Sequence, residues 1–388
     1  MIKANIITCS DWRWQVIENH KLGLIINPIA GIGGKAGLKG SDQRDCWQRA
    51  IQMGLKPEAN HRAVTALKVL RTLAPGNLAL WTGPHEMGET AALEARFNPQ
   101  VIGKAKQGAT TGSDSERIAR EMLAKDLDLL LFVGGDGTAR NICASVGHAC
   151  AVLGIPAGVK MHSAVFAVNP GSAARLTAEF LQHKLPVASR EVMDIDEDRF
   201  RRGVVDVKLY GHLLVPESAV LVQGAKAAGQ SSDDTGIRGI AATIAERMDG
   251  DSYWVFGPGG TTQGIMHALG LEGTLLGVDL VQDGEIVARD LNEPALNAAV
   301  AGQQVRIVLT PIGGQGHILG RGNQQIGPSL ILQAGKENLV IVSLLGKLAT
   351  IPGGALLVDT GSDEVDQMLR GPIRVLTGYR HEHVCRIH

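Results

Sequence analysis

The stretch at residues 127–138, LDLLLFVGGDGT, constrains the fold of this chain more than any other. Residues 128–133 form a short, mostly apolar run, the pattern of a strand covered on both faces in a parallel sheet. The glycines at 134, 135 and 137 then interrupt it, and residues 139–146 have a helical composition. The stretch therefore predicts a buried strand, a glycine loop and a helix in direct succession.

Glycine in such a loop has two uses. It allows backbone conformations that residues with a Cβ avoid, and it lets a ligand approach the main chain closely. The first N–H groups of the following helix lack partners within the helix, so they attract anions such as phosphate. Asp136 is the only carboxylate in the loop. A simple capped turn would explain Asp136, but such turns seldom need three glycines in five residues.

The surrounding sequence predicts two domains. Strand and helix patterns alternate up to about residue 183, which favours an α/β domain with a mostly parallel sheet flanked by helices. After a change of composition near residue 184, residues 191–196 and 204–210 alternate apolar and polar side chains, as antiparallel strands with one wet face do. We therefore expect a nucleotide-binding α/β domain at 1–185. A second, mixed α+β, strand-rich domain is expected at 186–388, with its last strand, 373–376, returning to the first domain.

The strand–GGDGT–helix unit resembles the motif of the NAD kinase and diacylglycerol kinase superfamily. The whole chain resembles the ATP-NAD kinase-like group, in its acetoin catabolism protein X branch. The resemblance implies an NAD kinase-like fold, ATP and Mg²⁺ as cofactors, and transfer of a phosphoryl group to a hydroxyl of NAD or another small metabolite. NADP biosynthesis would be its role if NAD is the acceptor. It also implies a homo-oligomer.

Phosphoryl transfer requires clamped phosphates, an in-line hydroxyl and a group that accepts its proton. Asp136 is the candidate catalytic residue, either as that base or as a carboxylate that orients Mg²⁺. The backbone N–H groups of Gly134, Gly135, Gly137 and Thr138 are expected to hold the donor phosphates, helped by the Thr138 hydroxyl. The chain contains neither a P-loop motif nor the protein-kinase loop set.

Further cofactor-binding candidates come from other loops. Asn27 ends the first predicted strand and matches the superfamily's asparagine that faces the nucleotide phosphates. Lys160 lies in the Gly/Pro-rich segment after the next strand, where a cation would suit a phosphate or stay solvated. Thr261 and Thr262 follow a strand in a second glycine loop, and Arg321, in the glycine-rich stretch 311–323, can pair with a phosphate or carboxylate. His162 is interpreted as structural.

One departure leaves the acceptor open. NAD kinases carry an Asn-Glu pair between the acidic loop and the second Gly/Thr loop, whereas the Asn292-Glu293 pair of this chain comes after both. A non-catalytic nucleotide-binding accessory or sensor protein, linked to acetoin catabolism, is therefore the alternative. A Rossmann oxidoreductase would depend on Gly31-x-Gly33-x-x-Ala36 alone, and the residues that follow do not continue that pattern.

Composition excludes several other classes. With 44% hydrophobic and 20% charged residues, the chain can fill a core, and a net charge of −1 gives no reason to bind nucleic acid or an anionic membrane. The five cysteines are scattered and show no zinc or disulfide spacing. No signal-peptide pattern and no apolar run of about 20 residues occurs. We expect a cytoplasmic protein acting on a small molecule, without a protein-bound metal cluster.

Overall fold

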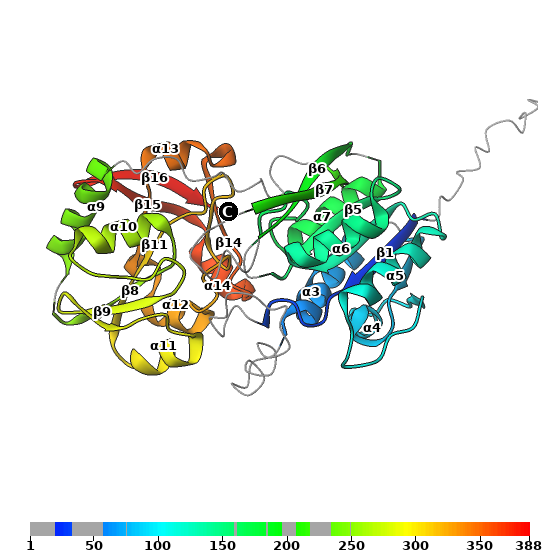
Figure 1. Ribbon diagram of the computed structural model, residues 1–388, viewed down its shortest axis with the longest axis horizontal. Helices are drawn as coiled ribbons and strands as arrows, with labels where there is room; N and C mark the ends of the chain where they lie inside the picture. Colours follow the sequence, from blue (N-terminus) through cyan, green and yellow to red (C-terminus); the bar gives the residue numbers. More distant parts are fainter. Residues whose placement is uncertain are drawn as a thin grey trace, which may run out of the picture.

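The computed structural model describes residues 20–32, 57–74, 76–158, 161–183, 185–195, 207–217, 234–248 and 250–388. Two lobes lie side by side, each built on its own sheet (Figure 1). The strands of the first sheet are β1 His20–Ile26, β2 Leu78–Thr82, β3 Gln100–Val101, β4 Leu129–Gly134, β5 Ala151–Pro156, β6 Val187–Ile195 and β7 Val207–Pro216. Its helices are α3 Ala59–Leu73, α4 Glu89–Glu94, α5 Gly112–Leu123, α6 Asp136–Val146 and α7 Pro170–Leu181, with the short 3₁₀ helix η1 His85–Met87.

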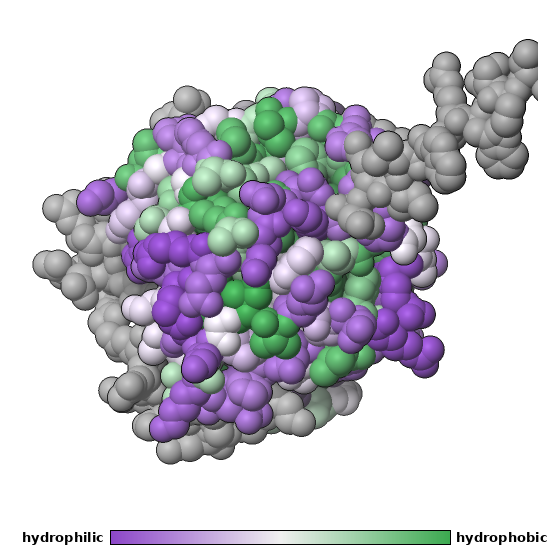
Figure 2. Space-filling model, turned by 90° about the vertical axis from the view of Figure 1, so that its right-hand side faces the viewer, coloured by the Kyte–Doolittle hydropathy of each residue, from purple (hydrophilic) through white to green (hydrophobic). Residues whose placement is uncertain are grey.

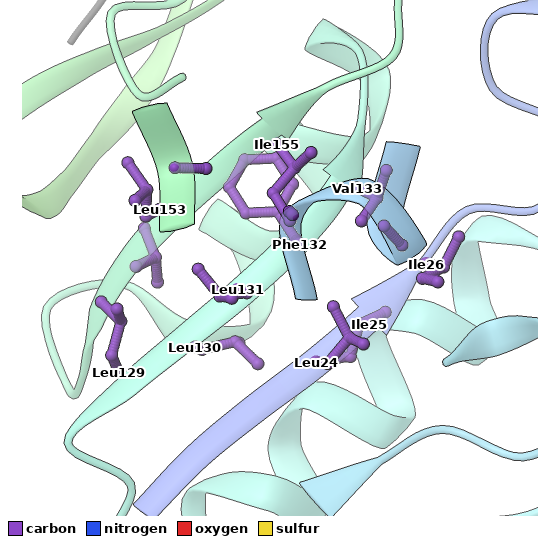
Figure 3. Packing of buried hydrophobic residues seen from close by; sticks show 14 of the residues in the cluster. Leu24, Ile25, Ile26, Leu129, Leu130, Leu131, Phe132, Val133, Leu153 and Ile155 are labelled. Carbon is purple, nitrogen blue, oxygen red and sulfur yellow. The ribbon is translucent and has the colours of Figure 1, made fainter. Parts of the chain in front are cut away.

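Strand β4 lies at the centre of this sheet, whose order is β3-β2-β1-β4-β5-β7-β6. It pairs in parallel with β1 on one side and β5 on the other. All six of its residues are buried, and Leu131, Phe132 and Val133 pack among side chains of β1 and β5 (Figure 3). The apolar run predicted as a doubly covered parallel strand is therefore confirmed, and its carboxyl end carries the glycine loop.

The first sheet continues beyond residue 185. β6 and β7 pair antiparallel with each other, as the alternating pattern predicted, and β7 also pairs in parallel with β5 through Ala151 and Leu214. The change of composition near residue 184 thus marks the change from parallel to antiparallel pairing. It does not mark the end of the sheet, because β7 still supplies core residues such as Leu213.

In the part of the chain that the structure describes, the second sheet has nine strands in the order β10-β9-β8-β11-β13-β15-β16-β14-β12. They are β8 Ser252–Phe256, β9 Asp279–Gln282, β10 Glu285–Ala288, β11 Gln304–Leu309, β12 His317–Leu319, β13 Leu339–Val342, β14 Ala355–Val358, β15 Gly371–Gly378 and β16 His381–Ile387. The helices are α9 Asp234–Arg247, α10 Gly260–Ala268, α11 Glu293–Ala299, α12 Pro328–Ala334, α13 Leu345–Ala349 and α14 Asp363–Leu369, with 3₁₀ helices η2 Lys336–Asn338 and η3 Pro352–Gly354. The mixed second domain is confirmed.

The return of the last predicted strand to the first domain is wrong. β15 contains residues 373–376 and pairs with β13 and β16 inside the second sheet. Hydrophobic clusters cover both faces of that sheet, one containing Ile307 and Leu330 and the other Trp254 and Ile240. β15 contributes Val375 to one cluster and Leu376 to the other, so apolar residues on both of its faces are buried within its own domain.

The strands β8, β11, β13 and β15 run parallel, so β8, β11 and β13 deliver their following loops to one edge of the second sheet. These loops begin with Gly257, Thr310 and Ser343. Figure 2 shows the face at the right of Figure 1, where apolar side chains form small groups among polar ones. Scattered groups of this kind are ordinary on protein surfaces.

Candidate active site

The glycine loop places the start of helix α6 directly at the carboxyl end of β4. Gly135 is the N-cap residue and Asp136 the first helical residue, and none of the described side chains caps the helix. The first backbone N–H groups of a helix have no partner within it, so those of Gly137 and Thr138 remain available to an anion. The predicted strand–loop–helix unit is thus present, with a helix N-terminus suited to phosphate.

The structure shows a reason for the first two glycines that was not predicted. Gly134 and Gly135 are not among the described glycines with positive φ, and Gly135 has an extended φ of −117°. A Cβ on Gly134 would lie 2.2 Å from the Thr138 hydroxyl oxygen, and one on Gly135 would lie 3.0 Å from the Cα atom of Gly158. Close packing, not an unusual backbone conformation, therefore requires glycine at both positions.

Asn27 and Thr138 come together at this edge of the sheet. The side-chain amide of Asn27 donates to the Thr138 hydroxyl over 3.0 Å, and its own oxygen accepts from the N–H of Ile29. Because the Thr138 oxygen accepts this bond, its hydroxyl proton can be directed to another acceptor. The structure therefore brings these two predicted phosphate-binding residues into direct contact.

Asp136 is held by the segment that follows β5. Its Oδ2 atom accepts the backbone N–H of His162 at 2.6 Å and lies 3.3 Å from His162 Nδ1, while Oδ1 accepts the N–H of Ser163 at 3.0 Å. Asp136 is only 5% exposed. Both carboxylate oxygens are thus occupied by this chain's own donors, an arrangement that the sequence did not predict.

His162 and Ser163 were missed as site residues. One indication of their position exists in the sequence, because their segment follows the strand next to β4, and parallel neighbours end at the same edge of a sheet. The segment is also fixed from two sides. The Ser163 hydroxyl donates to Met193 O on β6 at 2.8 Å, and Gln315 of the second domain donates to Met161 O at 3.0 Å.

The second glycine loop lies in the other domain. Thr261 and Thr262 occupy the first turn of α10. The Thr262 hydroxyl donates to Gly259 O at 2.8 Å, whereas the Thr261 hydroxyl accepts from the Lys347 ammonium at 3.2 Å. Lys347 also donates to Thr310 at 2.9 Å, in the stretch that leads to Gln315. The start of α10 is thus hydrogen-bonded to Lys347 of α13.

Arg321 pairs with a carboxylate, but that carboxylate belongs to this chain. Its Nη2 lies 2.6 Å from Asp359 Oδ2, which also lies 2.8 Å from Nη1 of Arg62 on α3. Burial alone would raise the pKa of Asp359, but the two arginines outweigh it and lower the pKa to about 2. Since Arg321 also donates to Val168 O, we assign it to the contact between the domains.

His317 lies in the same buried group. Burial and the neighbouring charge of Arg321 lower its pKa to about 3, so the imidazole is neutral at physiological pH. Its Nε2 atom lies 3.4 Å from Val168 O, in the first domain. Three side chains of the second domain, His317, Arg321 and Gln315, therefore hold carbonyl groups of the segment 161–168, which includes the donors to Asp136.

The remaining candidates are placed as follows. Lys160 lies outside the described residues. Asn292 caps α11, where its side chain accepts from the N–H of Ala295 at 2.9 Å, so the Asn-Glu pair begins a helix of the second domain. Within the described ranges, no three His, Cys, Asp or Glu side chains are grouped so that they could hold a metal ion. None of the described helices has both the length and the apolar character needed to cross a bilayer.

Comparison with solved structures gives only remote similarities. A putative diacylglycerol kinase from Bacillus anthracis str. Sterne is 18% identical over 46% of either chain, with a TM-score of 0.23. A UDP-N-acetylglucosamine 2-epimerase is 12% identical over 88% of this chain and 84% of that one, with a TM-score of 0.26. The chain thus spans about half the length of the diacylglycerol kinase. No property of this protein follows from superpositions of that quality.

Comparison with curated proteins found no match. Two family models do match: the ATP-NAD kinase N-terminal domain over residues 22–185 and the ATP-NAD kinase C-terminal domain over residues 249–387. The first match contains β4, the glycine loop and the segment that holds Asp136. Because the two matches follow one another and span most of the sequence, the chain belongs to the ATP-NAD kinase family.

Proposed function

We propose that this protein is an ATP-dependent kinase that phosphorylates a hydroxyl group of NAD or of another small metabolite. Family membership supports a phosphotransferase of the kinase type. The observation that carries the proposal is the start of α6, where uncapped N–H groups and the Thr138 hydroxyl lie at the carboxyl end of the central strand. A polyphosphate is the ligand whose charge and oxygen atoms match those donors.

The residues present fit the phosphates of ATP. Gly137 and Thr138 lie in the first turn of α6, where backbone N–H groups have no partner within the helix and can donate to phosphate oxygens. Mg²⁺ usually reaches such sites with the nucleotide and takes one or two carboxylates besides phosphate and water, so a protein cage is not required. Bound ATP with Mg²⁺ supplies the phosphoryl group and neutralises its charge.

In this proposal the chain's own residues bind and orient. The N–H groups of Gly137 and Thr138 hold phosphate oxygens, and Asn27 fixes the Thr138 hydroxyl so that its proton points to the nucleotide. Asp136 is fixed as a hydrogen-bond acceptor by His162 and Ser163. Positioning of this kind contributes much of the catalysis of phosphoryl transfer, because little covalent chemistry is left to the protein.

The proposal leaves the identity of the phosphate acceptor open. Asn292 caps a helix in the second domain, and its Asn-Glu pair comes later in the chain than the pair that holds the dinucleotide in NAD kinases, so the acceptor stays open. Thr261 is better placed than Thr262 to bind an acceptor, because the Thr262 hydroxyl is already donated to Gly259 O. With Lys347 beside it, the Thr261 loop suits an acceptor that carries an acidic group.

The proposal is tested by incubating the purified protein with ATP, Mg²⁺ and a panel of hydroxyl-bearing metabolites that includes NAD. Mass spectrometry should detect one acceptor that gains a single phosphoryl group. Thr138→Val, which keeps the side-chain shape but removes the hydroxyl, should slow the transfer. No phosphorylated product from any member of the panel would contradict the proposal.

A second function is favoured by one observation: both carboxylate oxygens of Asp136 already accept hydrogen bonds from this chain. A carboxylate that is 5% exposed, with both oxygens accepting N–H groups, is also what a non-catalytic nucleotide-binding sensor would retain. Such a protein would serve as an accessory, in acetoin catabolism if the resemblance holds. Calorimetry that shows ATP binding, together with an absence of product in the screen, would support this function instead.

A further inference from the structure

His162 has the geometry of an oriented acid–base residue. Its Nδ1 atom lies 3.3 Å from Asp136 Oδ2, and its own backbone N–H donates to the same oxygen at 2.6 Å. The imidazole is almost fully buried, at 4% exposure. Its other ring nitrogen, Nε2, is buried and has no hydrogen-bond partner in the described part of the chain.

These contacts determine the tautomer. A carboxylate accepts hydrogen bonds, so the ring nitrogen beside Asp136 must carry the proton, and Nε2 of the neutral ring then holds a lone pair. A buried acceptor without a partner destabilises the protein, and a histidine with a purely structural role has no reason to carry that cost. A hydroxyl group that donates to Nε2 would remove this cost.

The backbone on either side of His162 is fixed. Ser163 is bonded to β6 through Met193, and Met161 accepts from Gln315 of the second domain. A side chain whose neighbours are held from two directions keeps its orientation, as a catalytic group must. Asp136 itself has both oxygens occupied, so His162 Nε2 is the better proton acceptor of the pair.

We propose that His162 is the general base of the phosphoryl transfer and that Asp136 is a positioning residue acting through it. This inference depends on the proposed kinase function. The acceptor hydroxyl gives its proton to His162 Nε2 while its oxygen forms a bond to the γ-phosphorus of ATP. The bond from that phosphorus to the bridging oxygen breaks, and ADP leaves. Asp136 stabilises the imidazolium of His162 until the imidazolium gives its proton to solvent.

Access to Nε2 has a structural condition. Because the atom is buried, an acceptor reaches it only when the groups that cover it move. Gln315 of the second domain contacts the residue before His162, since its side-chain amide donates to Met161 O.

The kinetic test compares His162→Ala with His148→Ala, whose histidine is exposed in the same domain. We expect kcat of His162→Ala to fall by about 10²–10⁴-fold, the usual contribution of a general base. Added imidazole should restore part of the loss, because the removed ring leaves space beside Asp136. His148→Ala should retain the wild-type kcat with or without imidazole, and thermal melts should show both variants folded.

A second measurement does not require turnover. Nitrogen-15 NMR of the histidine rings should show His162 with its proton on Nδ1 and His317 with its proton on Nε2, because His317 faces Val168 O through Nε2. Asp136→Asn should abolish the preference of His162 and leave that of His317 unchanged. A proton found on His162 Nε2 in the wild type would overturn the inference whatever the activity.

The outcomes separate the two proposals. If the wild-type protein transfers phosphate and His162→Ala does so equally well, the proposed function stands and the role of His162 is wrong. If the wild type transfers phosphate to no acceptor, the proposed function and the role of His162 fall together. Loss of activity with rescue by imidazole, joined to the Nδ1–H tautomer, supports both.

Discussion

Arg62 and Asp359 are 297 positions apart in the sequence, and their side chains meet at 2.8 Å between Nη1 and Oδ2. Arg62 belongs to α3 of the first domain, whereas Asp359 follows β14 of the second, and these elements face each other where the lobes meet (Figure 1). Arg62 also donates to Pro156 O, at the end of the strand that leads to Met161 and His162. The contact between the domains therefore reaches the segment that holds Asp136.

Removing the shared carboxylate should destabilise the protein strongly. Asp359→Asn removes the carboxylate that Arg321 and Arg62 share and leaves Arg62 only its longer pair with Glu58, and breaking a buried pair from one side costs about 3–5 kcal/mol. Glu382→Gln is the control, because its partners Arg247 and Arg374 are both solvent-exposed, and such pairs contribute about 0–1 kcal/mol. Denaturant unfolding of both variants measures the difference, and equal losses would contradict the role of Asp359.

His317 should make stability depend on pH. The unfolded histidine gains a proton below its ordinary pKa of 6.5, but the folded one gains it only below about 3. Its contribution to stability is therefore complete above pH 6.5 and is lost as the pH falls toward 3, at about 1.4 kcal/mol per pH unit. Arg321 and Arg62 oppose its protonation, and Asp359 favours it.

The variant His317→Gln isolates this effect, because glutamine can still donate to Val168 O and does not titrate. Between pH 6 and 4, its free energy of unfolding should fall less steeply than that of the wild type, by about 1.4 kcal/mol per pH unit. The contribution of Asp359 to stability falls only at lower pH, because its pKa of about 2 in the folded protein lies under the ordinary value of 3.8. Parallel curves for the two proteins would show that His317 is protonated in the folded state.

Thr138 should matter for nucleotide affinity more than for stability. Thr138→Val keeps the packing against Gly134 but loses the hydroxyl that Asn27 orients. Loss of one hydrogen bond to a charged phosphate costs about 1.5–3 kcal/mol, so the Kd for ATP should rise by at least about tenfold. Calorimetry with Thr350→Val as the control tests this, and an unchanged Kd for Thr138→Val would place the phosphates elsewhere.

Local pattern was enough to predict the centre of the site. The apolar run of β4 and the glycines after it placed Asp136 and Thr138 at the carboxyl end of a buried parallel strand. The pairing of Asn27 with Thr138 agrees with the residue that the family resemblance indicated. Alternating polarity likewise predicted that β6 and β7 are antiparallel.

Contacts between segments far apart in the sequence could not be predicted from local pattern. Nothing near Asp359 in the sequence indicates Arg62 or Arg321, because ion pairs of this kind leave no periodic pattern. Gly134 was expected for its backbone freedom, whereas the side chain of Thr138, one helical turn later, is what excludes a Cβ. His162 was interpreted as structural, since its neighbour Asp136 lies 26 positions earlier and only the folded sheet joins them.

The most direct test of the account is the rate of γ-phosphoryl transfer from radiolabelled ATP to the acceptor found by the metabolite screen. Wild type, Asp136→Asn and His148→Ala should be measured side by side. We predict that Asp136→Asn, which cannot fix the His162 tautomer, lowers kcat by at least about 10²-fold, while His148→Ala equals the wild type. Transfer by Asp136→Asn at the wild-type rate would contradict the central claim that this glycine loop is the site of phosphoryl transfer.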